Sequence, residues 1–120
     1  MPYSHNVKKL EELILGSRPG EVSYTGGVHG EHLYKNTDFA IQRSFLPAGT
    51  TLDIHEHNVT EIIIGLSGCA KISSEAISKD LHPGEVIYLK PRQAHKCEAS
   101  EDSWVLGILV PCNGGYPDSK

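Results

Sequence analysis

The residues with the clearest chemical potential are two histidines and a glutamate in the middle of the chain. His55 and His57 are two positions apart, and Glu61 follows shortly after them. On a β-strand, side chains two positions apart project from the same face, about 7 Å from one another along the strand. Because imidazole nitrogens bind metal ions at roughly 2.0–2.1 Å, both histidines could hold one ion if the strand curves around it.

Glu61 and His95 extend this pair to a candidate set of four ligands. A hairpin through residues 58–60 would return the Glu61 carboxylate to the two histidines. His95 follows an extended segment and a turn that contains Pro91, and it joins the set if the sheet folds over. Three neutral imidazoles and one carboxylate suit iron(II), manganese(II), nickel(II) or zinc, so we expect one such divalent ion per chain, of undetermined identity. A six-coordinate metal in this set keeps open positions for substrate activation.

Short extended segments must position these residues. They are rich in β-branched and aromatic residues and are separated by the turn signals PAG at 47–49, HPG at 82–84 and NGG at 113–115. They cover residues 39–45, 51–57, 60–66, 70–74, 85–89, 93–98 and 104–110. This pattern predicts an all-β antiparallel sandwich or barrel. Leu10, Leu13 and Ile14 are at helical spacing and predict one short amphipathic helix over residues 7–15.

Length and composition favour a single domain. The chain has 120 residues, of which 38% are hydrophobic, and this is enough to close one core. We expect an N-terminal segment at 1–18, the β domain at 19–112 and an irregular tail at 113–120. The net charge of −4 argues against a nucleic-acid partner. No apolar run reaches the roughly 18 residues of a membrane span, and the N-terminus does not resemble a secretory signal, so we expect a cytoplasmic protein without a membrane partner.

The spacing of these residues resembles the first motif of the cupin family. Gly49, His55, His57, Glu61 and Gly68 match G-x5-H-x-H-x3-E-x6-G at every defining position. The segment from Gly84 to Ala99 is similar in part to the second motif, G-x5-P-x-G-x2-H-x3-N, because Gly84 and His95 fit, whereas Lys90, Arg92 and Ala99 replace its proline, glycine and asparagine. The resemblance implies a small single-domain cupin of the RmlC-like type. It further implies a jelly-roll β-barrel (a double-stranded β-helix), His55, His57, Glu61 and His95 as metal ligands, and a homodimer.

Three further residues are weaker candidates for catalytic or substrate-binding roles. Asp53 shares the parity of the two histidines and could orient an imidazole N–H, although an exposed strand residue is an equal alternative. Arg43 shares the parity of Phe39, Ile41 and Phe45, so it could face the barrel interior and clamp a carboxylate, unless the register slips or its head reaches solvent. Tyr88 could donate its hydroxyl to the pocket, but a half-buried strand position is the simpler interpretation.

The remaining cysteines and histidines are assigned no chemistry. Cys69 and Cys97 are most simply buried apolar residues, and three widely spaced cysteines, including Cys112, do not indicate a disulfide framework. The other histidines are expected in loops or weakly patterned segments, exposed to solvent: His5, His29, His32 and His82.

Two classes of function follow from the site. The first is an enzyme that acts on a small carboxylate- or hydroxyl-bearing molecule, by Lewis-acid isomerisation, decarboxylation or lyase chemistry or, with iron(II), as a dioxygenase. The second is a non-catalytic ligand-binding or sensor protein. A purely structural barrel is disfavoured, because three inward histidines and a glutamate are costly to bury without a metal.

Overall fold

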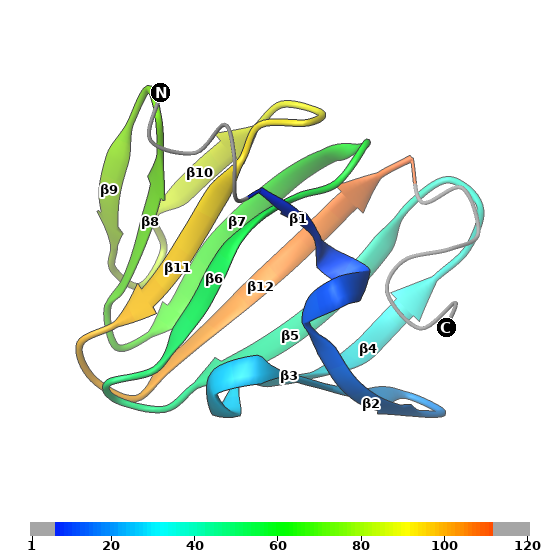
Figure 1. The fold of residues 1–120 in the computed structure, drawn as a ribbon, viewed down its shortest axis with the longest axis horizontal. Helices are drawn as coiled ribbons and strands as arrows, with labels where there is room; N and C mark the ends of the chain where they lie inside the picture. The colour runs from blue at the N-terminus through cyan, green and yellow to red at the C-terminus, as the bar shows by residue number, and fades with distance from the viewer. Residues whose placement is uncertain (1–6, 112–120) are drawn as a thin grey trace.

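The fold is a sandwich of two β-sheets that curve around a shared interior (Figure 1). The structure is a computed structural model, and it describes residues 7–111. The five-stranded sheet has the order β1-β6-β11-β8-β9, and the seven-stranded sheet has the order β10-β7-β12-β5-β4-β3-β2. The expected all-β jelly-roll architecture is confirmed.

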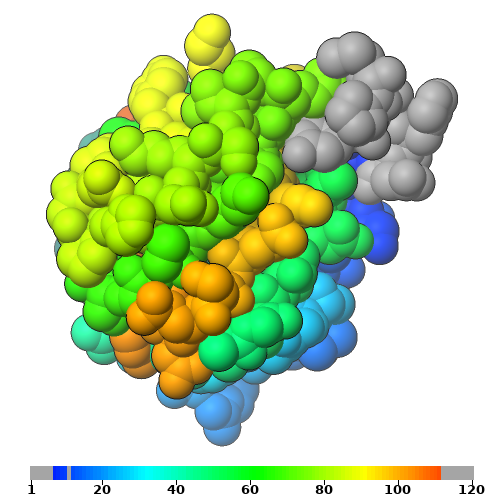
Figure 2. Space-filling model, turned by 90° about the vertical axis from the view of Figure 1, so that its left-hand side faces the viewer, coloured from blue at the N-terminus to red at the C-terminus, as the bar shows by residue number. Residues whose placement is uncertain are grey.

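The smaller sheet carries the first motif on one strand and the end of the second motif on its neighbour. Its strands are β1 (Lys8–Lys9), β6 (Thr51–Glu56), β11 (His95–Ala99), β8 (Ala70–Ser74) and β9 (Ser78–Leu81). Apart from the short parallel pair β1–β6, all its neighbours are antiparallel. Figure 2 looks onto the outer face of this sheet, where β8 and β9 in yellow-green are followed by β11 in orange and β6 in green.

The larger sheet closes the other side of the interior. Its strands are β10 (Val86–Leu89), β7 (Thr60–Ser67), β12 (Ser103–Val110), β5 (Ala40–Leu46), β4 (His29–Lys35), β3 (Glu21–Tyr24) and β2 (Ile14–Arg18). Neighbouring strands of this sheet are all antiparallel. Every strand expected from the sequence is present, with ends that shift by at most two residues.

The prediction of an N-terminal helix was wrong. Residues 10–13 form only a 3-10 turn, η1 (Leu10–Leu13), and the chain is extended on both sides of it. The side chains of Leu10 and Leu13 are both buried in the core. A single 3-10 turn, with about three residues per turn, already places them on the same side, so their spacing does not require a longer helix. A second 3-10 turn, η2 (Thr25–Gly27), joins β3 to β4.

The core lies between the two sheets and follows the alternation of their strands. On β7, Glu61 and Ile63 face the interior, and on β12, Val105 and Leu109 do so. Within residues 7–111, no helix is long and apolar enough to cross a membrane. The expected tail at 113–120, together with His5 and Cys112, lies outside the described residues.

Candidate metal centre

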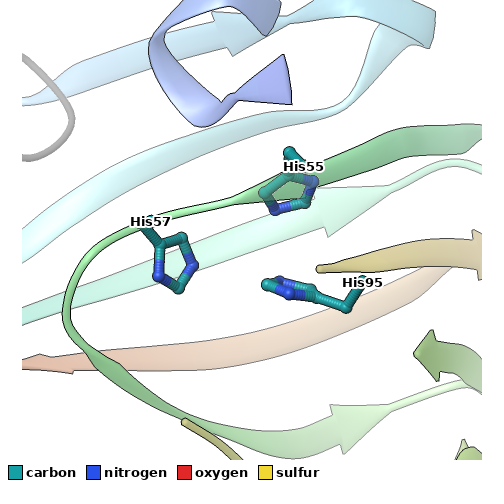
Figure 3. A group of neighbouring side chains, drawn as sticks. All are labelled: His55, His57 and His95. Atoms are coloured by element: carbon teal, nitrogen blue, oxygen red, sulfur yellow. The ribbon is translucent and has the colours of Figure 1, made fainter. Parts of the chain in front are cut away.

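Two neighbouring strands bring three histidines to one point in the interior. His55 lies near the end of β6, His57 follows directly after that strand, and His95 opens β11 opposite His55 in the antiparallel register. The three rings point toward one another (Figure 3). Their candidate ligand nitrogens all lie within 4.8 Å of one another. The ring centroids of His55 and His95 are 4.3 Å apart, and that of His57 lies 5.3 Å from that of His95.

Main-chain carbonyls fix the tautomer of these rings. In each histidine, Nδ1 lies near the carbonyl oxygen of a residue two positions away, and the pairs are His55 with Asp53 at 2.7 Å, His95 with Gln93 at 2.9 Å and His57 with Val59 at 3.4 Å. Because a carbonyl only accepts, each ring donates an Nδ1 proton there. Nε2 of each ring then faces the centre of the cluster, which is the arrangement found in histidines that bind metals. In His57 this atom donates to Glu61, and a bound metal ion would displace the proton.

Glu61 lies within the same cluster. Its Oε1 is 2.8 Å from Nε2 of His57 and 3.4 Å from Nε2 of His95. Burial by itself raises the pKa of the Glu61 carboxyl, but the charge and hydrogen bond of His57, and then the nearby His95, outweigh it and lower the pKa below its usual range. Glu61 is therefore a buried carboxylate anion, and it needs a positive partner in this interior.

The donors fit a divalent transition metal. Burial, and then the neighbouring His95, lower the pKa of His55 to about 3, so this imidazole is neutral at physiological pH. Nε2 of His95 is buried and makes no hydrogen bond to any of the described residues. A neutral imidazole and an unsatisfied buried nitrogen beside a carboxylate are groups that a metal ion would satisfy together. The cluster is thus a candidate metal centre.

A small cavity of about 50 Å³ adjoins the cluster. His55, Glu61 and His95 line one part of it, and most of the remaining lining is apolar. The other polar part of the cavity lining is formed around Gln42, whose Nε2 donates to the Tyr24 hydroxyl and the Ser44 hydroxyl, each at 3.0 Å. Oε1 of Gln42 is buried and has no hydrogen-bond partner among the described residues.

The three weaker candidates from the sequence do not reach this centre. Arg43 is exposed on the outer face of β5, where it pairs with Glu31 and lies 5.3 Å from the centroid of the Trp104 ring, so its head reaches solvent and it does not face the interior. The Asp53 carboxylate accepts a hydrogen bond from the Ile54 amide, and it is the main-chain carbonyl of Asp53 that orients His55.

The positions of Tyr88 and the cysteines also differ from expectation in part. Tyr88 is exposed on β10 rather than half-buried, because Ile87 and Leu89 take the inward positions of that strand. Cys97 is buried, as expected, whereas Cys69 is only partly buried.

Comparison with known structures supports the architecture independently. An RmlC-like cupin from Shewanella frigidimarina NCIMB 400 is 14% identical, covers 95% of this chain and 97% of its own, and has a TM-score of 0.70. KdgF from Halomonas sp. is 19% identical, covers 82% and 84%, and has a TM-score of 0.67. A structure of the DMSP lyases RdDddP and RnDddQII is 16% identical, covers 75% of this chain and 50% of its own, and has a TM-score of 0.69.

The chain has the cupin fold. At these identities the likeness establishes the fold alone. No family model matches the sequence, and no curated protein matches it either.

The departures from the second cupin motif preserve the turn that positions His95. Arg92 occupies the place of the motif's glycine and has a φ of +64°, so the backbone keeps the left-handed conformation that glycine adopts most easily. Its amide donates to the carbonyl of His57 at 2.8 Å. One residue further, the Gln93 side chain bonds the Lys90 amide and the Ser74 hydroxyl, at 2.9 and 3.1 Å. The turn is therefore tied to the chain on both sides of the cluster.

Sequence reasoning missed Gln42, Gln93 and Gly107. A Cβ atom on Gly107 would lie 3.0 Å from Oε2 of Glu61, so this glycine leaves the space that the carboxylate fills. Gln42 could have been found from its position on β5. It alternates with the large apolar residues that were expected to face inward, so it lies on the opposite face of the strand from them. No comparable signal marked Gln93, whose role depends on contacts across the turn.

Proposed function

We propose that this cupin-fold protein binds one divalent transition metal through His55, His57, Glu61 and His95 and acts there on a small carboxylate- or hydroxyl-bearing molecule. The observation that carries the proposal is the convergence of three carbonyl-oriented imidazoles beside a buried carboxylate. Iron(II), manganese(II), nickel(II) and zinc all suit this donor set. One of the similar structures is described as that of lyases, which agrees with small-molecule chemistry on this fold.

The charge of the site narrows the class of ligand. A divalent ion together with the Glu61 carboxylate leaves a net charge of about +1, and neither lysine nor arginine is among the residues that line the cavity. A monoanion would neutralise this charge, whereas a dianion would leave one charge unpaired. The free Oε1 of Gln42 adds a hydrogen-bond acceptor. The site therefore favours a small monocarboxylate that also carries a hydroxyl group.

Each group of the chain has a defined part in this chemistry. The metal would supply Lewis-acid polarisation of a bound oxygen or, if it is iron(II), oxygen activation. The three imidazoles hold their Nε2 atoms inward because their Nδ1 protons are engaged. Glu61 offsets part of the metal charge, and Gln42 accepts from the ligand hydroxyl. The apolar cavity wall excludes water, which strengthens these electrostatic contacts.

One observation favours a non-catalytic alternative, a sensor of the same ligand. Arg43, Asp53 and Tyr88, the residues considered for substrate binding or proton transfer, do not line the cavity. Incubation of the metal-loaded protein with glycolate under air and under nitrogen separates the two functions. An enzyme of this type would convert the ligand in a metal-dependent way, whereas a sensor would release it unchanged.

We propose also that two copies of the chain pair through the larger sheet. The support is its outer face, where β5, β12, β7 and β10 place apolar side chains directly beside one another in register. Across this face, Ile41, Ile108, Ile62 and Tyr88 form one continuous row.

Elemental analysis tests the metal centre directly. We expect the protein, purified without an affinity tag, to contain or take up close to one metal ion per chain. Replacing both His55 and His57 by alanine should reduce this stoichiometry toward zero while the β circular dichroism persists. The matched control replaces His29 and His82, which are exposed, and should retain the metal. Full metal content in the H55A/H57A variant would refute the assignment.

A further inference from the structure

A second group of reactive side chains lies outside the barrel interior. Sγ of Cys69 is 3.8 Å from Nε2 of His82, and Nδ1 of the same ring is 3.0 Å from Oε1 of Glu85. Cys69 follows β7, whereas His82 and Glu85 belong to the β9–β10 turn. These two turns lie on the same side of the molecule (Figure 1). A thiol, an imidazole and a carboxylate are thus arranged in the order nucleophile, base and orienting group.

The position of the thiol is fixed by its neighbours. Gly68 has a φ of +75°, and a Cβ atom there would lie 2.2 Å from the Asp102 carbonyl oxygen, so the backbone before Cys69 packs directly against the β11–β12 loop. The Cys69 amide donates to the Ser103 hydroxyl at 3.0 Å. That hydroxyl donates in turn to the Glu101 carbonyl at 2.7 Å. The β11–β12 loop and the first residue of β12 therefore hold Cys69 in place.

The imidazole is oriented by Glu85. Oε1 of Glu85 accepts a hydrogen bond from the His82 amide at 2.9 Å and another from the His82 ring. The carboxylate therefore binds both the backbone and the side chain of His82. The Glu85 amide returns a hydrogen bond to the His82 carbonyl at 3.0 Å. Gly65 of β7 anchors this turn through bonds to Gly84 and Glu85, at 2.8 and 2.9 Å. The distance between thiol and ring is therefore set by the framework of the fold.

The orientation of the ring determines its role. A carboxylate only accepts, so Nδ1 of His82 carries the proton that it donates to Glu85. The Nε2 lone pair then faces Sγ of Cys69, which is the arrangement of a general base toward its nucleophile. We propose that Cys69 is an activated surface thiol, deprotonated by His82, that forms a mixed disulfide with low-molecular-weight disulfides. Glu85 serves as a positioning residue.

The step is a thiol–disulfide exchange. The Cys69 proton moves from Sγ to Nε2 of His82, and the thiolate attacks one sulfur of the disulfide R–S–S–R. A new S–S bond joins Sγ to that sulfur while the original S–S bond breaks, and the second sulfur leaves as a thiolate. This leaving thiolate takes the proton from His82. The cysteine is oxidised, the disulfide is reduced, and the products are the mixed disulfide and one R–SH.

The surroundings of Cys69 admit such a reagent. Cys69 is partly exposed and lines a surface groove together with Thr51 and the charged side chains of Lys71, Asp80 and Glu98. Lys79 adds a positive charge near Glu85. Cys97 differs in every respect, since it is buried, and burial together with Glu61 and Glu98 raises the pKa of its thiol. Of these two cysteines, only Cys69 combines access with a neighbouring base.

Reaction with 4,4′-dithiodipyridine tests the proposal, because the released thione is measured by its absorbance. The full chain should show one fast-reacting thiol at pH 7, and peptide mass mapping should locate the adduct at Cys69. His82→Gln should slow this phase roughly tenfold or more at pH 7 and much less at pH 10, where thiols lose their proton without a neighbouring base. Glu85→Gln should slow it by a smaller factor, and His29→Gln should leave it unchanged.

Each alternative outcome overturns the assignment. A fast phase that persists in Cys69→Ser would assign the reactivity to another cysteine. Equal rates for the wild type and His82→Gln across pH 6 to 8 would remove the base from the proposal. Because His82 and Glu85 have exposed side chains, the two glutamine variants should keep the wild-type β circular dichroism. A change in rate with pH that is the same in all variants would reflect thiol ionisation alone and would also contradict the role of His82.

Discussion

Each histidine of the candidate metal centre owes its orientation to a main-chain carbonyl two positions away. This matters because a carbonyl cannot be titrated or removed by a side-chain substitution, so the inward direction of the Nε2 atoms is a property of the strand ends themselves. The Asp53 side chain, which the sequence suggested as an orienting group, is not needed for this purpose. The Nδ1 protons of the metal-binding tautomers are therefore held in place before any metal binds, and a metal would displace only the Nε2 proton that His57 donates to Glu61.

Gln42 offers a test of ligand recognition at the level of one atom. Its Oε1 is buried and unpaired, and a ligand hydroxyl would supply the missing donor. We expect the metal-loaded protein to bind glycolate more tightly than propionate, which is similar in size but has a methyl group in place of the hydroxyl. In Gln42→Met this preference should shrink by about fivefold to tenfold, the value of one buried hydrogen bond. Isothermal titration calorimetry with both acids measures it.

Two internal controls make that experiment decisive. Propionate affinity and metal stoichiometry should stay unchanged in Gln42→Met, because neither depends on the amide. An unchanged preference for glycolate would mean that chelation of the metal by the hydroxyl explains it and that Gln42 takes no part. Loss of metal in the variant would instead show that the amide supports the metal centre.

At the scale of elements, β12 makes room for the carboxylate on its neighbour β7. Gly107 pairs with Ile63 of β7 and Gln42 of β5, and an added Cβ would lie 3.0 Å from Oε2 of Glu61. Gly107→Ala should therefore displace this carboxylate and weaken metal binding by about tenfold or more. Gly16→Ala is the matched control, because a Cβ there meets nothing within 4 Å. Metal titration of both apo variants checks the difference.

The outcome separates a local effect from a general one. If Gly107→Ala binds metal as tightly as the control, Glu61 either adapts without cost or is not a ligand. If both variants lose stability equally in thermal unfolding, the change reflects the loss of glycine from a strand. Only weaker metal binding specific to Gly107→Ala supports the proposed part of Glu61.

The strands that carry the motifs could be predicted from sequence, and the N-terminal third could not. Regions such as 51–56 and 60–67 combine β-branched residues with clear turn signals, so their positions followed from pattern alone. The strands β2, β3 and β4 contain glycine, serine and charged residues, and only tertiary pairing makes them extended. The prediction of a helix around Leu10–Leu13 failed for a related reason, because residues at helical spacing also fit a single turn of 3-10 helix.

The inward face of β5 could not be predicted because both of its faces mix apolar and polar residues. Ile41 and Phe45 were expected inside, yet they lie on the outer face with Arg43, while Ala40, Gln42 and Leu46 face the interior. Alternation identifies a buried face only when the other face is polar. The four proposed metal ligands came together as the cupin motif implied, whereas Gln42 required the register that only the structure provides.

At the scale of the whole molecule, the outer face of β5, β12, β7 and β10 is largely apolar apart from Arg43. Beside the row that begins at Ile41, a second row carries Leu106, Ile64 and Val86 in register, and Trp104 adds a further aromatic side chain. Several of these side chains are exposed, among them Tyr88 at 56% and Val86 at 49%. A contiguous apolar surface of this kind marks an interface, and a second copy of the same face would cover it symmetrically.

Ile108 lies at the centre of this face, on β12 between Ile41 of β5 and Ile62 of β7. Ile108→Lys would place a charge in the middle of the proposed dimer interface. We therefore expect the dissociation constant of the dimer to rise by at least about 100-fold. Light scattering should give twice the 13.1 kDa chain mass for the wild type and the single-chain mass for this variant. Ile77→Lys, at an exposed apolar position in the β8–β9 loop, should remain a dimer. A monomeric wild type, or an Ile108→Lys dimer of unchanged stability, would contradict pairing through this sheet.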